Sequence, residues 1–138
     1  MLEAALLKDI TTSVQLALAE DLGLTLDTNI NADNDITAAL IPADTVASAS
    51  VITREDCVIC GVAWVNEVFK QLDNASGLET KITWFVNDGE TVKANTTLFE
   101  LSGNARLLLT GERAALNFLQ TLSSTATLAN TYVKVLSD

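Results

Sequence analysis

The stretch from residue 106 to residue 120 reads Arg106-Leu-Leu-Leu-Thr-Gly-Glu-Arg-Ala-Ala-Leu-Asn-Phe-Leu-Gln120. When it is placed on a helix at about 100° per residue, its polar side chains fall in one narrow arc. This arc contains Arg106, Thr110, Arg113, Asn117 and Gln120. Leucine, alanine and phenylalanine cover most of the remaining circumference, whereas a surface helix has a narrower apolar stripe below a broad charged face. The pattern therefore predicts a helix that the rest of the fold encloses on most sides.

Two arginines of this arc, Arg106 and Arg113, suggest a place for an anion. The chain has 18 acidic and 8 basic residues, and its net charge is −10. The alternative is that both arginines pair with carboxylates of the same chain, and the pattern leaves the two interpretations equally open. Glu112 is also unusual, because it lies among apolar positions of the helix, and a buried carboxylate needs a partner or a raised pKa. It either bonds locally or meets a charge from outside this chain.

Length and composition limit the class of protein. A chain of 138 residues suits one domain with its own hydrophobic core. The acidic pI of about 4.2 argues against nonspecific binding to nucleic acid or to anionic membranes, since both need a concentrated basic face. No apolar run approaches the roughly 20 residues that span a bilayer. The first residues include Glu3 and lack the basic segment of a signal peptide, so we expect a cytoplasmic protein.

Cys57 and Cys60 form a Cys-x-x-Cys pair. A redox site is conceivable, because a helix N-terminus lowers the pKa of a thiol. A zinc site has little support, since the chain has no histidine and two thiols fill half of a tetrahedral shell. Apolar residues surround the pair at an expected strand-to-helix junction, which favours two small core residues.

Apolar spacing predicts helices and strands in a mixed order. The expected helices are 2–22, with a break near Asp9, then 61–72, and 104–136, with an interruption near Ser123-Ser124. The expected strands are 45–53, 81–86 and 97–101, with a hairpin-type turn at residues 87–89. Residues 24–35 are expected to form a polar loop whose aspartates are turn and cap residues rather than calcium ligands. Glu20 and Asp21 are expected to be solvated, and the order of elements favours an α+β fold.

Several segments resemble, in order along the chain, the amino-terminal part of the quinolinate phosphoribosyltransferase family. They are residues 20–23, 34–38, 41–43, 51–55, 60–65, 84–89, 98–103 and 109–120, the last reading Leu109-Thr-Gly-Glu-Arg-Ala-Ala-Leu-Asn-Phe-Leu-Gln120. The resemblance implies an open α/β sandwich with helices at both ends. It also implies that residues 1–116 form the amino-terminal domain and that residues 117–138 are the opening helices of a carboxy-terminal α/β barrel. The rest of that barrel has no counterpart in this chain.

The family reaction joins quinolinate to phosphoribosyl pyrophosphate, with Mg²⁺, and gives nicotinate mononucleotide, pyrophosphate and carbon dioxide for NAD synthesis. The resemblance implies a homo-oligomer, at least a dimer, in which Arg113 reaches the active site of a neighbouring subunit. Arg106 is the second candidate for substrate binding. Catalytic residues and magnesium ligands would lie outside these residues, so the chain alone is expected to be inactive. The sequence departs from the family at Ser124, where a glycine is common, which could alter the break between the last helices.

Two other functions remain as alternatives. Residues 84–103 follow a strand, Asp-Gly turn and strand pattern similar to biotinyl and lipoyl carrier domains, with Lys81 and Lys93 flanking the turn. A non-catalytic interaction module is the other alternative, since the apolar circumference of the helix from Arg106 to Gln120 has no obvious partner in the chain. Exposed apolar surface of this kind usually marks an interface.

Overall fold

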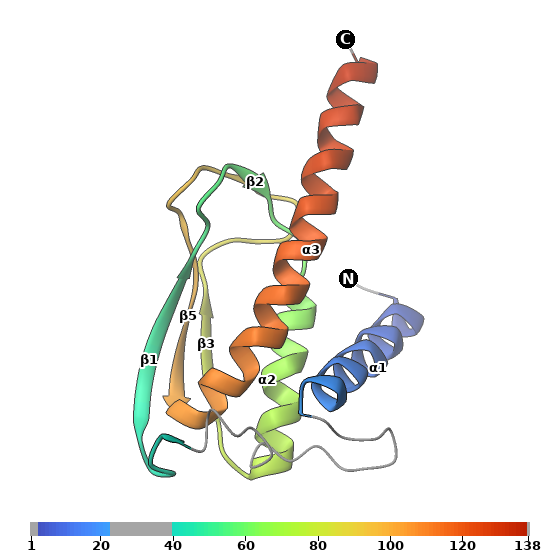
Figure 1. The fold of residues 1–138 in the computed structure, drawn as a ribbon. Helices are drawn as coiled ribbons and strands as arrows, with labels where there is room; N and C mark the ends of the chain where they lie inside the picture. Colours follow the sequence, from blue (N-terminus) through green and yellow to red (C-terminus); the bar gives the residue numbers. More distant parts are fainter. Residues whose placement is uncertain (1–2, 23–39, 138) are drawn as a thin grey trace.

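A three-stranded antiparallel sheet with helices on one face forms the frame of the molecule (Figure 1). The computed structural model describes residues 3–22 and 40–137. The helices in these ranges are α1 (Ala4–Asp21), α2 (Val62–Ser76) and α3 (Ala105–Ser137). The strands are β1 (Val46–Ile52), β2 (Cys57–Val58), β3 (Lys81–Trp84), β4 (Thr91–Val92) and β5 (Thr97–Asn104). The predicted α+β class is confirmed.

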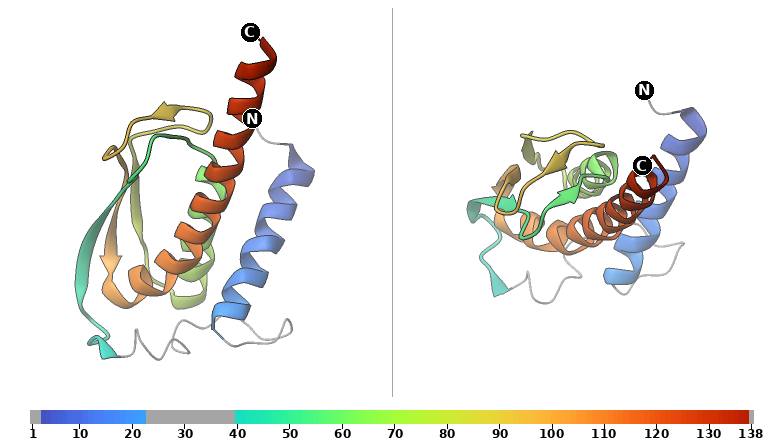
Figure 2. Two further views of the ribbon diagram at one scale, coloured as in Figure 1. Left: turned by 45° about the horizontal axis from the view of Figure 1, so that its top comes forward. Right: turned by 90° about the horizontal axis from the view of Figure 1, so that it is seen from above.

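The strands form two separate sheets. The larger has the order β1-β5-β3, with Ser102 of β5 opposite both Ser48 and Lys81, and the smaller pairs β2 with β4. Along β1 exposed and half-buried residues alternate, as expected for a strand with one covered face. Helices α2 and α3 cover that face, and α1 packs on them from outside (Figure 2). The other face is open, so the expected open sandwich is present, and the described residues form no α/β barrel.

The core lies between the sheet and the helices. Most of its fully buried large side chains come from α1, α2 and β5. They are Val14, Leu18, Val65, Val68, Phe69, Leu72, Phe99 and Leu101. Gly111 of α3 faces α2, and a Cβ added there would lie 2.5 Å from Cε1 of Phe69. The missing side chain therefore lets the two helices approach closely.

Helix α1 is continuous, so the predicted break near Asp9 is wrong. Its buried residues Ile10, Val14 and Leu18 recur every four positions along one face. The hydroxyls of Thr11 and Thr12, which follow Asp9, donate to the carbonyls of Leu7 and Lys8 one turn earlier. This bonding satisfies the threonines inside a helix and removes the reason for a break. The predicted loop 24–35 lies outside the described residues.

The predicted turn at Asp88 and Gly89 is present. Gly89 has φ +85°, and the N–H of Glu90 donates to the carbonyl of Asn87 at 3.2 Å. The predicted strands on either side, 81–86 and 97–101, correspond to β3 and β5, which pair antiparallel, while the short strand β4 between them pairs with β2. The strands β2 and β4 were not predicted, since elements of two residues have no periodicity to detect.

Helix α3 runs without interruption from Ala105 to Ser137, so the predicted break near Ser123-Ser124 is wrong. The expected enclosure is confirmed for its first half, where residues such as Leu107, Ala115 and Leu119 are buried. Its second half projects beyond the rest of the fold and is mostly exposed (Figure 1). The expected domain boundary between residues 116 and 117 falls inside α3 and stays a prediction. No helix among the described residues is long and apolar enough to cross a membrane.

Candidate functional site

Arg106 lies in the first turn of α3 and holds a neighbouring loop. Asn104 begins the helix, since its Oδ1 accepts the N–H groups of Arg106 at 3.0 Å and Leu107 at 3.3 Å. The Nε of Arg106 donates to the carbonyl of Ile41. The side-chain amide of Asn104 donates to the carbonyl of Ala43, 2.7 Å away. These bonds connect the start of α3 to residues 41–43, so Arg106 has a structural role here.

Arg113 forms an ion pair with Asp21, the last residue of α1. Its Nε and Nη2 lie 3.2 and 3.1 Å from Oδ2 of Asp21. The side chains are 44% and 31% exposed, respectively. Asp21 is exposed, as expected, but it also carries this ion pair, which was not predicted for it. A carboxylate at a helix C-terminus is disfavoured by the helix dipole, and the guanidinium offsets this cost. For Arg113, the interpretation that it pairs with a carboxylate of its own chain is the correct one in this structure.

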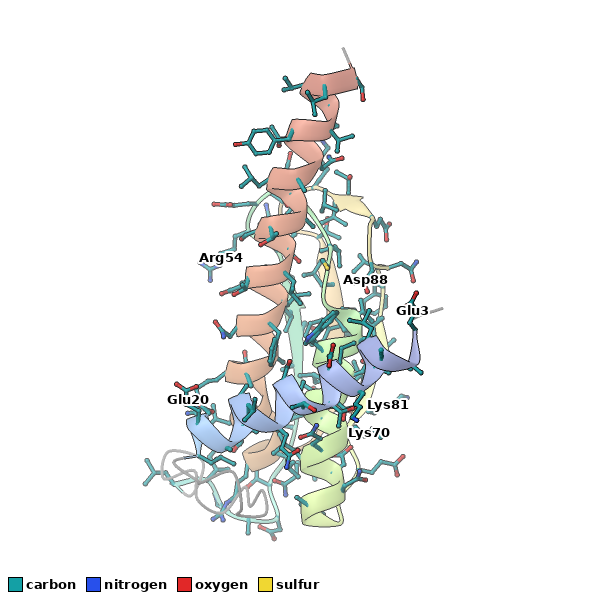
Figure 3. The ribbon with its side chains drawn as sticks, turned by 90° about the vertical axis from the view of Figure 1, so that its right-hand side faces the viewer. Glu3, Glu20, Arg54, Lys70, Lys81 and Asp88 are labelled. Atoms are coloured by element: carbon teal, nitrogen blue, oxygen red, sulfur yellow. The ribbon has the colours of Figure 1, made fainter. Side chains whose placement is uncertain are left out.

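The polar arc of α3 does not form one continuous surface. Thr110 is fully buried, with 0% exposure, whereas Arg113, Asn117 and Gln120 are exposed. Figure 3 shows α1 crossing in front of α2 and α3, with Glu20 at the end nearer to α3. Along the arc, Arg106 contacts the loop at residue 41, Arg113 contacts the end of α1, and Gln120 faces solvent. A helical wheel cannot separate these environments, because neighbouring helices determine them.

Glu112 faces a groove of about 1010 Å³ between α3 and the segment from β1 to β2. The groove floor is apolar, with Ile59, Leu98, Leu116 and Leu119 among its lining residues. Its charged lining residues are Arg54, labelled in Figure 3, and the acids Glu55, Asp56 and Glu112. One guanidinium against these carboxylates makes the groove negative, so it is poorly suited to a dicarboxylate or a polyphosphate. Within the described residues Glu112 is half-buried and has no ion pair.

Cys57 and Cys60 are both free and half-buried, at the predicted strand-to-helix junction. The Sγ of Cys57 lies 3.6 Å from Oγ1 of Thr53. Burial and the negative charge of Asp88 raise the pKa of the Cys60 thiol above its ordinary value. A raised pKa leaves little thiolate near neutral pH, which is unfavourable for redox chemistry. The interpretation as small structural residues is therefore favoured.

Asp88 was not singled out by sequence reasoning, yet it caps α2 from a distance. Its Oδ1 accepts the N–H groups of Gly61 at 2.9 Å and Val62 at 3.1 Å. It thereby satisfies N–H groups that have no partner inside the helix. A capping residue is sought next to its helix, and residue 88 is far from residue 62 in the sequence. No local signal could have identified it.

Lys93, the carrier-domain candidate, lies in a turn that is tied to another segment. The N–H of Ala94 donates to Asp56 at 2.8 Å, and the ammonium group of Lys93 lies 3.6 Å from the same carboxylate. The flanking strands β4 and β5 belong to different sheets. Lys93 therefore does not occupy the tip of a hairpin, unlike the modified lysine of a carrier domain.

The described residues do not fit a metal site. Residues 3–22 and 40–137 contain no group of three or more histidine, cysteine, aspartate or glutamate side chains that could hold a metal ion. Carboxylate oxygens are what Mg²⁺ would require from a protein. No magnesium ligand is therefore assigned to these residues.

The described residues form an open α+β sandwich from which the long helix α3 projects. The family model described as quinolinate phosphoribosyl transferase, N-terminal domain, matches residues 35–123. The chain belongs to this family.

Solved structures and curated relatives agree with this assignment. The nicotinate-nucleotide pyrophosphorylase from Francisella tularensis superposes with a TM-score of 0.81 at 42% identity, covering 96% of this chain and 43% of that one. NadC from Streptococcus pyogenes gives 0.79 at 29% identity, covering 94% and 42%. The mitochondrial quinolinate phosphoribosyltransferase [decarboxylating] 2a of Nicotiana tabacum is 36% identical over 121 residues, which is 87% of this chain and 31% of that relative. The chain thus spans about a third of this curated relative.

Proposed function

We propose that this chain is the amino-terminal domain of an enzyme that makes nicotinate mononucleotide from quinolinate and phosphoribosyl pyrophosphate, for NAD synthesis. The observation that carries the proposal is the match over 96% of the chain to the Francisella tularensis pyrophosphorylase. The second half of the proposal is that the substrates and the magnesium ion bind outside these residues, and the negative groove supports it for the two anionic substrates. The chain alone is then inactive.

Arg113 is the residue through which this domain serves an active site in a neighbouring subunit of a homo-oligomer. Its side chain is 44% exposed, and the carboxylate of Asp21, with which it forms an ion pair, is also partly exposed. Exposed ion pairs contribute less than about 1 kcal/mol, so a substrate carboxylate or phosphate can compete with Asp21. Asp21 would then hold the arginine extended until a substrate binds. Arg106 is the weaker candidate, because its Nε already holds the loop at Ile41.

A single-turnover assay tests whether the chain is inactive alone. The 138-residue chain is mixed with quinolinate, phosphoribosyl pyrophosphate and Mg²⁺, and nicotinate mononucleotide is measured by chromatography. No product is expected. Product formed by the pure chain at a rate above that of the buffer would show that the substrate site is complete here.

A chimera tests the role of Arg113. Residues 1–138 replace the matching part of the Francisella tularensis enzyme, and Arg113→Met is compared with Arg54→Met. Loss of a charged group that meets a substrate anion should lower kcat/KM by about 100-fold or more, while Arg54→Met leaves it within about twofold. The melting temperature of both variants should match the parent chimera. If the two variants were equally active, Arg113 would have no role in substrate binding.

A cytoplasmic location remains a prediction. Curated plant relatives are named as mitochondrial in Nicotiana tabacum and chloroplastic in Oryza sativa, which describes those proteins alone.

The second candidate function is an interaction module. It is favoured by the exposed apolar side chains of the projecting half of α3, which are Leu128, Tyr132, Val133, Val135 and Leu136. If the chimera is inactive although it is folded, this candidate gains support.

A further inference from the structure

Two hydroxyl side chains of α3 bond to the backbone of Val58, the last residue of β2, and of Cys60, in the segment that leads to α2. The Oγ1 of Thr127 accepts the N–H of Val58 at 2.9 Å and donates to the carbonyl of Ser123 at 2.7 Å. The Oγ of Ser123 accepts the N–H of Cys60 at 3.0 Å and donates to the carbonyl of Cys60 at 3.1 Å. We call the three bonds to Val58 and Cys60 the hydroxyl clamp.

The clamp bonds to the edge of β2 that has no neighbouring strand among the described residues. One edge of β2 pairs with β4, and the hydroxyls of α3 satisfy backbone groups that point away from β4. Backbone groups that are removed from water need such partners. Ser123 itself is 7% exposed, so its bonds with Cys60 are made largely out of contact with solvent.

Gly61 lets the same segment lie directly on α3. A Cβ at this position would lie 3.4 Å from both Cα of Leu119 and Cδ1 of Leu122, and the φ of Gly61 is +124°. Asp88 holds the segment from the other side through the N–H groups of Gly61 and Val62. The backbone to which the clamp bonds is therefore itself fixed.

The clamp lies where the local sequence disfavours a helix. Residues 123–125 read Ser-Ser-Thr, and side chains that bond to nearby backbone lower helix propensity. Helix α3 nevertheless continues to Ser137, and few of the residues after Thr127 touch the rest of the fold. Something other than local propensity must keep this part of α3 straight.

We propose that Ser123 and Thr127 are positioning residues that lock α3 to β2 and thereby fix the direction of the projecting half of α3. This inference does not depend on the proposed enzymatic function. It explains why the helix is unbroken at the place where its sequence favours an interruption. It also sets the angle between residues 128–137 of α3 and the strands of the larger sheet.

Double electron–electron resonance between two nitroxides tests the proposal. The labels are placed at Thr83→Cys on the open face of β3 and at Tyr132→Cys on the projecting half, after Cys57→Ala and Cys60→Ala. Ser123→Ala combined with Thr127→Val should broaden the distance distribution at least twofold relative to the parent. Thr127→Ser keeps a hydroxyl and should retain the narrow distribution.

Thr125→Val is the matched control. It makes the same isosteric change two residues away, where the hydroxyl bonds within α3 to the carbonyl of Thr121 at 3.0 Å. A distribution as narrow in the clamp variant as in the parent would overturn the proposal. Equal broadening of the distance distribution by Thr125→Val would also overturn the proposal, because the loss of any hydroxyl from this part of α3 would then cause the same effect.

Hydrogen exchange covers the case in which the double variant does not fold. Thr127→Val alone, in the chain with its natural cysteines, should accelerate amide exchange in residues 128–137 about tenfold. Exchange in α1 and α2 should remain unchanged. Unchanged exchange in residues 128–137, or equal acceleration everywhere, would contradict a local positioning role.

Discussion

A half-exposed ion pair joins the last residue of α1 to the middle of α3. Solvent screens such a pair, and two long side chains lose freedom when they form it. We therefore expect Asp21→Asn to lower the free energy of unfolding by less than about 1 kcal/mol, measured by urea denaturation. Glu20→Gln, which removes the same charge one residue earlier, is the control. A loss above about 2 kcal/mol, specific to Asp21→Asn, would mean that Arg113 mainly serves stability.

Asp88 acts both on α2 and on Cys60. Its negative charge is the second cause, after burial, of the raised pKa of the Cys60 thiol. Asp88→Asn keeps an oxygen that can cap α2 but removes the charge, so the pKa of Cys60 should fall. At pH 8 the thiolate fraction then rises, and we expect alkylation of Cys60 by iodoacetamide to accelerate a few-fold. Peptide mass spectrometry follows the rate, with Cys57 as the internal control. A slower or unchanged rate at Cys60 would contradict this assignment.

At the scale of elements, the contact between α2 and α3 depends on Gly111. Ala would normally favour a helix interior by about 1 kcal/mol over Gly. Here its Cβ would lie 2.5 Å from Phe69 and 3.0 Å from Leu72, so the helices would have to separate. We expect Gly111→Ala to lower the free energy of unfolding by about 1–3 kcal/mol in thermal or urea denaturation. Asn117→Ala, on the exposed face of the same helix, should be neutral or stabilising. A stabilised Gly111→Ala variant would contradict this expectation and show that the side chains between α2 and α3 can make room for the added Cβ.

Long periodic elements were predictable from the sequence, and short or long-range features were not. The helices and the strands β1, β3 and β5 follow apolar spacing within a few residues at each end. The two helix breaks that were wrongly predicted, near Asp9 and at Ser123-Ser124, both concern hydroxyl residues. A serine or threonine favours a helix break only while its hydroxyl has no better partner. In α1 that partner is the preceding turn, and in α3 it is the backbone of residues 58–60. The second of these is a tertiary contact, which no local pattern contains.

The candidate site shows the same limit. The arc on α3 was visible as a pattern, but Asp21 and Arg113 are far apart in the sequence, so their ion pair was left as one of two interpretations. The resemblance to a family predicted the fold correctly, and the proposed reaction rests on it. It could not show what each arginine touches.

At the scale of the whole molecule, the projecting half of α3 and the groove leave apolar surface exposed. Tyr132 is 63% exposed and Leu136 is 85% exposed. Exposed patches of this kind usually mark an interface, so we expect the isolated chain to self-associate. Sedimentation velocity should show a weight-average coefficient that rises with concentration, and Tyr132→Ser with Leu136→Ser should reduce that rise. Thr131→Ser is the control. A concentration-independent monomer that binds no hydrophobic dye would contradict this expectation.

The order of strands in the larger sheet has a consequence for biosynthesis. β5 lies between β1 and β3 but comes last of the three along the chain. The amino end of a polypeptide emerges from the ribosome first. Both outer strands, β1 and β3, therefore emerge before β5, the strand with which they pair. Until residue 104 has left the exit tunnel, the nascent chain carries two unpaired strands and an uncovered α2. If translation stalls after β3 and before β5 has emerged, β1 and β3 cannot form a smaller sheet with each other, because each pairs only with β5. The stalled chain would then be prone to aggregation.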